Sequence, residues 1–218
     1  MRHYITVLTI HYIPFASQHN GKMSAYISHM ILYEFVDSGN CYKIRMLLAE
    51  LELPYTKVAL DRLSSVRNTM EFLCKSPLGK VPVLEQDGEY YTESMAILYK
   101  LSTGTSLNPE SPRVIQWLSF EQGEIQSSIG AARYLNKFCQ ELPPADLIER
   151  AHEALCVVEQ QLKETGQYIL GSTYSICDIA LYAYIHLAPE AGVSLEPYIH
   201  IMQWILTIQG LPRYVAII

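Results

Sequence analysis

The stretch that decides the fold reads Lys80-Val81-Pro82-Val83-Leu84-Glu85-Gln86-Asp87-Gly88-Glu89-Tyr90-Tyr91-Thr92-Glu93-Ser94. Asp87-Gly88 is typical of a tight turn between two antiparallel strands. Pro82 has no N–H for a sheet ladder, so it marks the mouth of the first strand and leaves the backbone of Val81 free to pair. The second strand returns Glu93 to that backbone, and Ser94 can open a helix whose first N–H groups face an anion. These three features together favour a receptor for a zwitterionic peptide.

The residues upstream of this hairpin alternate between strand and helix patterns. Residues 31–36 predict a strand, and apolar residues at helical spacing over 44–51 predict the helix that follows. Residues 57–60 predict a second strand, which a right-handed crossover would place parallel to the first. A weaker helix is expected over 67–75. The order β-α-β-α-β-β-α over residues 30–102 is the thioredoxin-like pattern.

Two motifs of this region resemble the peptide-binding signature of the glutathione transferases. The first is Ser76-Pro77-Leu78-Gly79-Lys80-Val81-Pro82, and the second is Thr92-Glu93-Ser94-Met95-Ala96-Ile97. An ordinary strand–turn–helix is the alternative, because X-Pro and Asp-Gly are each common. Their ordered conjunction is much rarer, which favours the binding interpretation.

The resemblance implies a role for each residue of the motifs. The bond from Val81 to Pro82 is expected to be cis, with the Val81 backbone pairing with the cysteinyl unit of glutathione. Glu93 and Ser94 would hold the γ-glutamyl amine and carboxylate, and Lys80 would lie near the glycyl carboxylate. Glutathione is therefore the expected co-substrate, and no metal is expected.

The loop Ser38-Gly39-Asn40-Cys41 lies between the first strand and its helix, where this fold keeps its reactive centre. Unpartnered N–H groups and the helix dipole favour a thiolate at such a helix start. Lowering the pKa of the glutathione thiol by about two units would raise its reactive fraction by up to roughly two orders of magnitude. By resemblance to serine-type transferases, Ser38 is assigned the leading catalytic role, and Asn40 could orient the sulfur.

Cys41 leaves two interpretations open. It could form a mixed disulfide with glutathione, as in beta-class enzymes, although their loop spaces serine and cysteine one residue further apart. Zeta-class enzymes carry Ser-Ser-Cys, and Asn40 occupies the place of that cysteine here. Alternatively, Cys41 is a small buried residue that packs the first helical turn.

From about residue 111 the sequence predicts an all-α domain over 111–218. Pro112 starts a long helix, Pro143-Pro144 breaks it, and a second long helix follows. Short helices are expected around residues 197–208 and 212–217. The resemblance therefore covers residues 30–218: a thioredoxin-like domain over 30–105, followed by the helical domain.

One sequence feature of the helical domain is a predicted capping box. Ser175 and Asp178, three residues apart before an apolar run, can satisfy each other's backbone N–H groups. This box recurs in the second domain of the transferases, where its role is in folding. Loss of Asp178 is expected to cost about 1 kcal/mol or more.

The long helix also supplies weaker candidates for the substrate cleft. In the soluble bacterial transferases, the electrophile lies between the domains, against this helix. Arg133 and Tyr134 are candidate wall residues, although such residues are more often packing or solvated. Glu121-Gln122 is interpreted as a surface or dimer contact.

Composition limits the possible functions. The chain has 218 residues, half of them apolar, enough for a substantial core. Its net charge of −6 argues against a nucleic-acid partner. Five scattered cysteines are not a disulfide framework and fit a reducing cytoplasm.

Residues 1–29 are expected to form a leader or a disordered extension, with an added strand or helix as the alternative. The apolar run over residues 4–16 contains His11 and Pro14 and lacks a good cleavage site for secretion. It is also too short to span a bilayer, so no membrane partner is expected. Four of the seven histidines lie in this segment, yet their spacing does not support a metal site.

The sequence thus predicts a cytoplasmic glutathione transferase, which the resemblance makes a homodimer. It would join the glutathione thiolate to a small hydrophobic electrophile held mainly by the helical domain. A glutathione-dependent disulfide oxidoreductase, or an isomerase or dehalogenase on the same site, is one alternative. A non-catalytic binding protein on this scaffold is another, although such relatives usually lose the Glu-Ser pair that this chain keeps.

Overall fold

The structure, a computed structural model, describes residues 7–8, 29–108 and 110–217. Most of the predicted leader or extension therefore lies outside the described residues. Within it, Val7–Leu8 form the short strand β1, so the alternative of an added strand applies to these two residues. Among the described residues, no helix is long and apolar enough to cross a lipid bilayer.

The first domain contains the predicted mixed sheet. Strand β2 (Met30–Glu34) pairs in parallel with β3 (Thr56–Ala59) and antiparallel with β4 (Val83–Gln86). β4 continues through the hairpin into β5 (Glu89–Tyr91), and β1 lies antiparallel at the other edge, on β3. The strand order is β1-β3-β2-β4-β5. The parallel pairing of β2 and β3 confirms the crossover predicted from the sequence.

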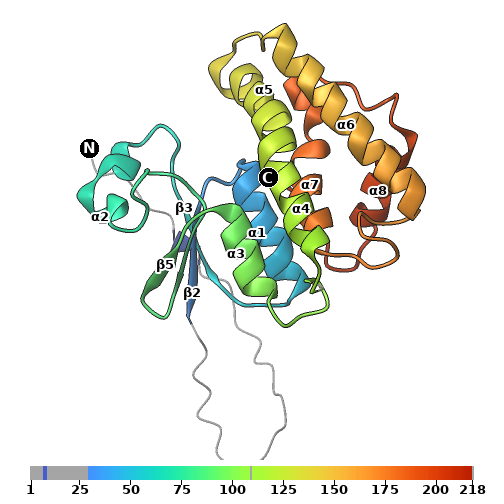
Figure 1. Ribbon diagram of the computed structural model, residues 1–218. Helices are drawn as coiled ribbons and strands as arrows, with labels where there is room; N and C mark the ends of the chain where they lie inside the picture. Colours follow the sequence, from blue (N-terminus) through green and yellow to red (C-terminus); the bar gives the residue numbers. More distant parts are fainter. Residues whose placement is uncertain (1–6, 9–28, 109, 218) are drawn as a thin grey trace, which may run out of the picture.

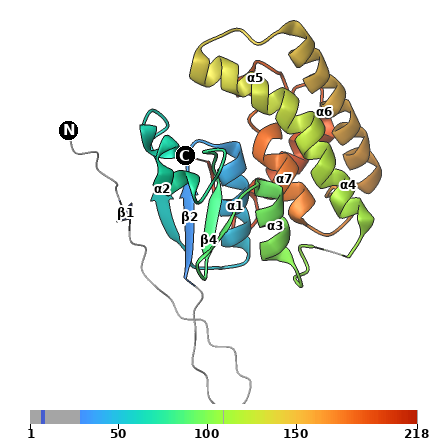
Figure 2. The same cartoon turned by 60° about the vertical axis from the view of Figure 1, so that its left-hand side comes forward.

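Helices cover this sheet on both sides. α1 (Gly39–Glu50) and α3 (Ser94–Ser102) lie side by side between the sheet and the helical domain (Figure 1). The short helices η1 (Ser65–Asn68) and α2 (Met70–Leu73) form the predicted weak helical region, and α2 lies at the opposite side of the sheet (Figure 2). This is the predicted thioredoxin-like domain.

The second domain is helical, as predicted. A continuous helical segment runs through α4 (Pro112–Phe120), η2 (Glu121–Gly130), α5 (Ala131–Arg133) and η3 (Tyr134–Cys139). It ends at Gln140, whose φ of 57° is left-handed. The remaining helices are α6 (Ala145–Thr165), α7 (Ile176–Ile185), η4 (Ala188–Ala191) and α8 (Ile199–Gln209).

The prediction of a helix over 212–217 is wrong. Beyond Gly210 the described chain turns and then runs without helix to Ile217. The Tyr42 hydroxyl donates a hydrogen bond of 2.6 Å to the carbonyl of Val215, and the Tyr214 hydroxyl lies 3.0 Å from that of Tyr182. These tertiary contacts hold the chain against α1 and α7.

Helix α7 is the centre of the core. All ten of its residues are buried, as expected for a helix that is apolar on every side. It begins with the predicted capping box, which the structure confirms. Asp178 also accepts hydrogen bonds from the Ile169 N–H at 2.9 Å and the Trp204 indole at 3.0 Å. Because α7 packs on α1, it fixes the start of α1 relative to the second domain.

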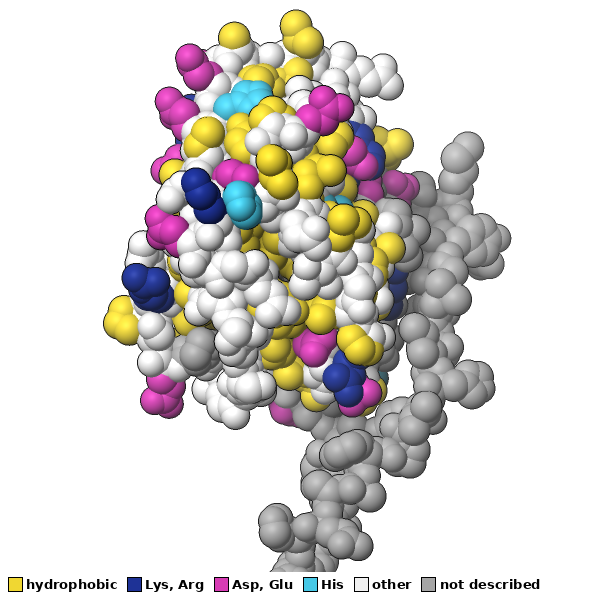
Figure 3. Space-filling view, turned by 90° about the vertical axis from the view of Figure 1, so that its right-hand side faces the viewer, with side chains coloured by type: hydrophobic (Ala, Val, Ile, Leu, Met, Phe, Trp, Pro, Cys, Tyr) yellow, Lys and Arg dark blue, Asp and Glu magenta, His cyan; other side chains and the backbone are white. Residues whose placement is uncertain are grey.

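The outer surface of the helical domain carries side chains of mixed type. On the side that carries α6 and α8, hydrophobic, acidic and basic side chains are interspersed (Figure 3). Among the apolar residues exposed there are Ile199, Met202 and Leu206 of α8.

Candidate active site

The hairpin of β4 and β5 places the first set of predicted site residues. Leu84 pairs with Tyr91 and Gln86 with Glu89. The turn residues Asp87 and Gly88 have φ of 55° and 82°, the left-handed values that this tight turn requires. This register returns the chain to the cis peptide bond between Val81 and Pro82, which confirms the expected geometry.

Glu93 has an unusual backbone conformation. Its φ of 64° and ψ of 111° are rare for a residue with a Cβ, and its side chain does not cap the helix that it precedes. Such backbone strain is typical of functional sites, where the surrounding structure holds it. Ser94 follows as the first residue of α3 and is buried, so the exposed Glu93 side chain stands beside a helix start.

The first cavity has a volume of about 250 Å³ and brings the predicted glutathione-binding residues together. Lys80, Val81, Pro82, Glu93 and Ser94 all line it. The rest of its lining comes from both domains. The first domain contributes Asn40, Ser76, Pro77, Leu78 and Thr92, and the helical domain contributes Gln122 and Gln126. Its walls are slightly more polar than apolar, and both domains contribute to them.

The start of α1 lies between this cavity and a second one. Ser38 is the N-cap of α1, and its Oγ accepts a hydrogen bond of 3.4 Å from the Cys41 N–H. Ser38 lines the second cavity, which has a volume of about 410 Å³, whereas Asn40 lines the first. Gln126 lines both. A group held in the first cavity near α1 is therefore adjacent to the second.

Cys41 is fully buried beneath this helix start. Burial raises the pKa of its thiol to about 12, although the hydrogen bond with Ser38 opposes the shift. A neutral thiol without access to a cavity is a poor nucleophile. Its surroundings agree with the packing interpretation of this residue.

The second cavity is mainly apolar, with two arginines in its lining. Its residues are Ser38, Gly39, Arg62, Gln126, Gly130, Ala131, Arg133, Tyr134, Leu135, Phe138 and Tyr184. Both wall candidates, Arg133 and Tyr134, are therefore among them. Tyr184 lies very close to the start of α1: a Cβ on Gly39 would be 2.7 Å from its ring. This close approach requires a glycine at position 39, because glycine has no Cβ.

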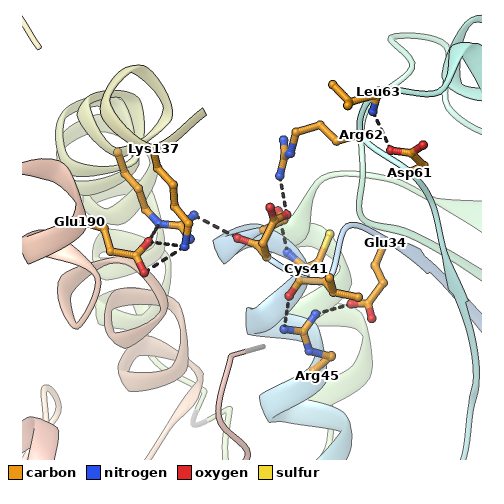
Figure 4. A network of polar contacts seen from close by, with 12 residues as sticks. Glu34, Cys41, Arg45, Asp61, Arg62, Leu63, Lys137 and Glu190 are labelled. Atoms are coloured by element: carbon orange, nitrogen blue, oxygen red, sulfur yellow. Dashed lines mark hydrogen bonds and ion pairs between the residues drawn. The ribbon is translucent and has the colours of Figure 1, made fainter. Parts of the chain in front are cut away.

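Each of the two arginines pairs with a carboxylate that does not line the cavity, and Figure 4 shows Arg62 and Glu190 within this network of polar contacts. Arg62 pairs with Asp37 at 2.6 Å, and its guanidinium lies 4.1 Å from the centre of the Phe138 ring. Arg133 pairs with Glu190 at 2.6 Å. Burial would raise the pKa of Glu190, but hydrogen bonds from Lys137 and Arg133 outweigh it and lower this pKa.

The comparison with protein families agrees with this geometry. The family model of the glutathione S-transferase N-terminal domain matches residues 32–109, and that of the C-terminal domain matches residues 132–212. The chain belongs to the glutathione S-transferase family. Both matches fall on the two domains described above, and the first contains the whole hairpin and the start of α1.

Solved glutathione S-transferases share this fold along nearly their whole length. A glutathione S-transferase from Pseudomonas fluorescens Pf-5 superposes with a TM-score of 0.82 and is 41% identical, covering 87% of this chain and 98% of its own. A homolog from Drosophila mojavensis, solved with bound glutathione, has a TM-score of 0.77 and is 26% identical, covering 85% and 89%.

A curated relative has a different activity. The disulfide-bond oxidoreductase YfcG of Escherichia coli is 29% identical over 199 residues, which cover 84% of this chain and 92% of that protein. Similarity to this chain is thus found among proteins with more than one activity.

A buried ion pair that the sequence patterns did not predict lies at the boundary of the two domains of this transferase family member. Lys43 of α1 and Glu121 of η2 are fully buried, and Lys43 Nζ lies 2.7 Å from Glu121 Oε1. The interpretation of Glu121-Gln122 as a surface or dimer contact is therefore wrong for Glu121. Gln122 lines the first cavity and donates to Glu121 Oε2 at 2.7 Å. A charged residue at position 43, between the apolar Tyr42 and Ile44, was the available signal.

Proposed function

We propose that the protein is an enzyme that binds glutathione in the first cavity and transfers its thiolate to an electrophile in the second. The observation that carries this proposal is the position of the start of α1 between the two cavities. Asn40 lines the first cavity and Ser38 lines the second. A glutathione sulfur at this point would contact the Ser38 hydroxyl and, at the same time, the reactive atom of an electrophile held in the second cavity.

The peptide part of glutathione fits the chemistry of the first cavity. The free backbone of Val81 would pair with the cysteinyl unit, and the Glu93 carboxylate would receive the γ-glutamyl ammonium. The N–H groups at the start of α3, with the Ser94 hydroxyl, suit the γ-glutamyl carboxylate. That hydroxyl donates to Asn40 Oδ1 at 3.3 Å in the structure, so a bound carboxylate would compete for it. Lys80 is exposed at the rim, where a glycyl carboxylate would end.

The reaction itself needs little from the protein beyond a stable thiolate. The Ser38 hydroxyl would donate a hydrogen bond to the sulfur, and the dipole of α1 favours the negative charge. The thiolate attacks an electrophilic carbon, a carbon–sulfur bond forms, and the leaving group departs with the electron pair of the bond that breaks. With an unsaturated electrophile, water returns a proton to the neighbouring carbon instead.

The lining of the second cavity indicates the kind of electrophile. Aromatic and aliphatic side chains suit an apolar body, as the sequence predicts. Arg62 and Arg133 are the charged residues of this lining, and their carboxylate partners Asp37 and Glu190 do not belong to it. Guanidinium groups bind carboxylates well. We therefore favour an electrophile that carries an acidic group on an apolar framework.

A disulfide oxidoreductase is the second candidate, supported by the similarity to YfcG. In that case the thiolate of bound glutathione would attack the disulfide, since Cys41 is buried and its thiol has a raised pKa. Family membership also supports our proposal of a cytoplasmic homodimer.

Calorimetry with glutathione tests the proposed function. Wild-type protein should bind glutathione saturably, and Glu93→Ala should weaken binding about tenfold, equal to about 1.4 kcal/mol. Glu89→Ala is the matched control, because this exposed glutamate of β5 does not line the cavity. An absence of saturable binding by wild-type protein would refute the proposal.

A further inference from the structure

The ion pair of Lys43 and Glu121 does more than join two helices, because Lys43 has a second partner. Its Nζ donates to Asn40 Oδ1 at 2.8 Å and to Glu121 Oε1 at 2.7 Å, and it lies 4.9 Å from the centre of the Tyr184 ring. Burial lowers the pKa of Lys43, and the contact with Glu121 opposes this shift. Taking both charges out of water is costly, so such pairs are weak sources of stability.

These contacts fix the orientation of the Asn40 side chain. An ammonium group has only donors, so the amide oxygen of Asn40 must face Lys43. The Ser94 hydroxyl donates to the same oxygen at 3.3 Å. With the oxygen held from two sides, the amide N–H groups of Asn40 are turned away from Lys43. Asn40 lines the first cavity, beside the start of α1.

We propose that Lys43 is a positioning residue for catalysis: together with Glu121 it holds Asn40 so that the amide Nδ2–H donates to the glutathione thiolate. This inference rests on the proposed function and adds a second hydrogen-bond donor to that of Ser38. The ion pair is neutral as a whole, so its effect on the thiolate comes from the orientation of Asn40. Because Glu121 belongs to the helical domain, the packing of the two domains controls the reactivity of the sulfur.

The test removes both charges together. Lys43→Met combined with Glu121→Leu replaces a buried ion pair by apolar side chains of similar size, a change that such sites often tolerate. The pKa of the bound glutathione thiol is read from the ultraviolet absorbance of its thiolate. We expect this pKa to rise by about one unit in the double variant, and by a similar amount in Asn40→Ala. In the triple variant the two effects should not add, because they act through one hydrogen bond.

A matched control exists on the same helix. Arg45 and Glu34 form another buried ion pair, at 2.5 Å, without contact to Asn40, and they have further partners in Lys57 (3.0 Å from Glu34) and the Val36 carbonyl (2.8 Å from Arg45). Arg45→Met combined with Glu34→Leu should change the thermal stability and leave the thiol pKa as in wild-type protein. A purely structural role of Lys43 predicts the same result for both double variants, and that result would overturn the inference.

Wild-type protein gives a second readout that leaves the ion pair of Lys43 and Glu121 intact. The side-chain amide resonance of Asn40, assigned by its loss in Asn40→Ala, should shift with pH at the pKa of the bound thiol. A resonance that does not respond would contradict the inference while leaving glutathione binding intact. Failure of wild-type protein to bind glutathione would instead overturn the proposed function as well.

Discussion

Arg133 donates a hydrogen bond of 3.0 Å from Nη1 to the backbone carbonyl of Asp37, the residue that precedes Ser38. The helical domain thereby holds the loop in which the sequence predicts the reactive centre. Arg62 pairs with the side chain of the same aspartate at 2.6 Å. Both domains therefore hold this loop. These two contacts are consistent with a site that needs the Ser38 hydroxyl in one fixed position.

The first prediction concerns that hydroxyl. Ser38→Ala should lower kcat about 10- to 100-fold with little change in glutathione affinity, because the hydroxyl stabilises the thiolate more than it binds the peptide. Steady-state kinetics with calorimetry would measure both quantities. Loss of the N-cap should also cost about 1 kcal/mol of stability.

A second capping serine provides the control. Ser111 caps α4 through its Oγ, far along the chain from the loop, so Ser111→Ala should lose similar stability and keep its kcat. If Ser38→Ala reduces affinity and turnover equally, Ser38 only positions the peptide.

The second prediction separates the two interpretations of Cys41. Cys41→Ala should keep conjugating activity within about twofold and lose about 1–2 kcal/mol of stability, because it deletes a fully buried side chain. Conjugation, turnover of hydroxyethyl disulfide and urea unfolding would be compared with wild-type protein. Disulfide turnover that disappears while conjugation continues would show that Cys41 reacts, against our account.

The third prediction concerns the charge of the electrophile. Arg62→Leu should lower kcat/KM for 4-chloro-3-nitrobenzoate about tenfold more than that for its methyl ester, since only the acid can pair with the guanidinium, whereas a disturbed Asp37 loop affects both substrates alike. Arg67→Leu is the matched control. Arg67 lies 5.1 Å from the centre of the Phe35 ring and does not line the second cavity. Equal losses for acid and ester would mean that Arg62 acts through packing.

The fourth prediction concerns the stability at acid pH. Burial lowers the pKa of His186 to about 4, and the ring stacks on Tyr182 with centroids 4.3 Å apart. The unfolded chain binds this proton below about pH 6.5, the folded protein only below about 4, so unfolding takes up a proton in between. The contribution of His186 to the free energy of unfolding is therefore complete above pH 6.5. It decreases as the pH is lowered from 6.5 to about 4, by at most about 3 kcal/mol.

His186→Phe keeps a ring on Tyr182 and removes the proton. Urea unfolding at pH 7.5 and pH 5 should show a smaller loss on acidification in the variant than in wild-type protein. Asp178 works in the opposite direction, because burial raises its pKa to about 6, and its effect cancels in this comparison. If the loss of stability between pH 7.5 and pH 5 is the same in the variant and in wild-type protein, His186 is protonated as readily in the folded protein as in the unfolded chain.

Local patterns in the sequence predicted much of this structure. The turn at Asp87-Gly88, the helix start at Ser94 and the capping box of Ser175 and Asp178 each depend on residues close together in the chain. The first two of these features place the peptide-binding half of the site. The roles assigned to its residues stay predictions until a ligand is bound.

Contacts between distant residues lay outside the reach of those patterns. Lys43 and Glu121 are 78 positions apart, and Arg133 and Asp37 are 96 apart. The predicted final helix is wrong for a related reason, because contacts with Tyr42 of α1 and Tyr182 of α7 hold this segment in a non-helical conformation. Burial of Cys41 likewise depends on how α1 packs, which its neighbours in sequence do not show.

The most direct test of the account is a crystal structure of the wild-type protein with glutathione. Our account predicts the cysteinyl unit against the backbone of Val81, the γ-glutamyl group at Glu93 and Ser94, and the sulfur within hydrogen-bonding distance of Ser38 Oγ. A sulfur that points away from this hydroxyl, or a first cavity that stays empty at saturating glutathione, would contradict it.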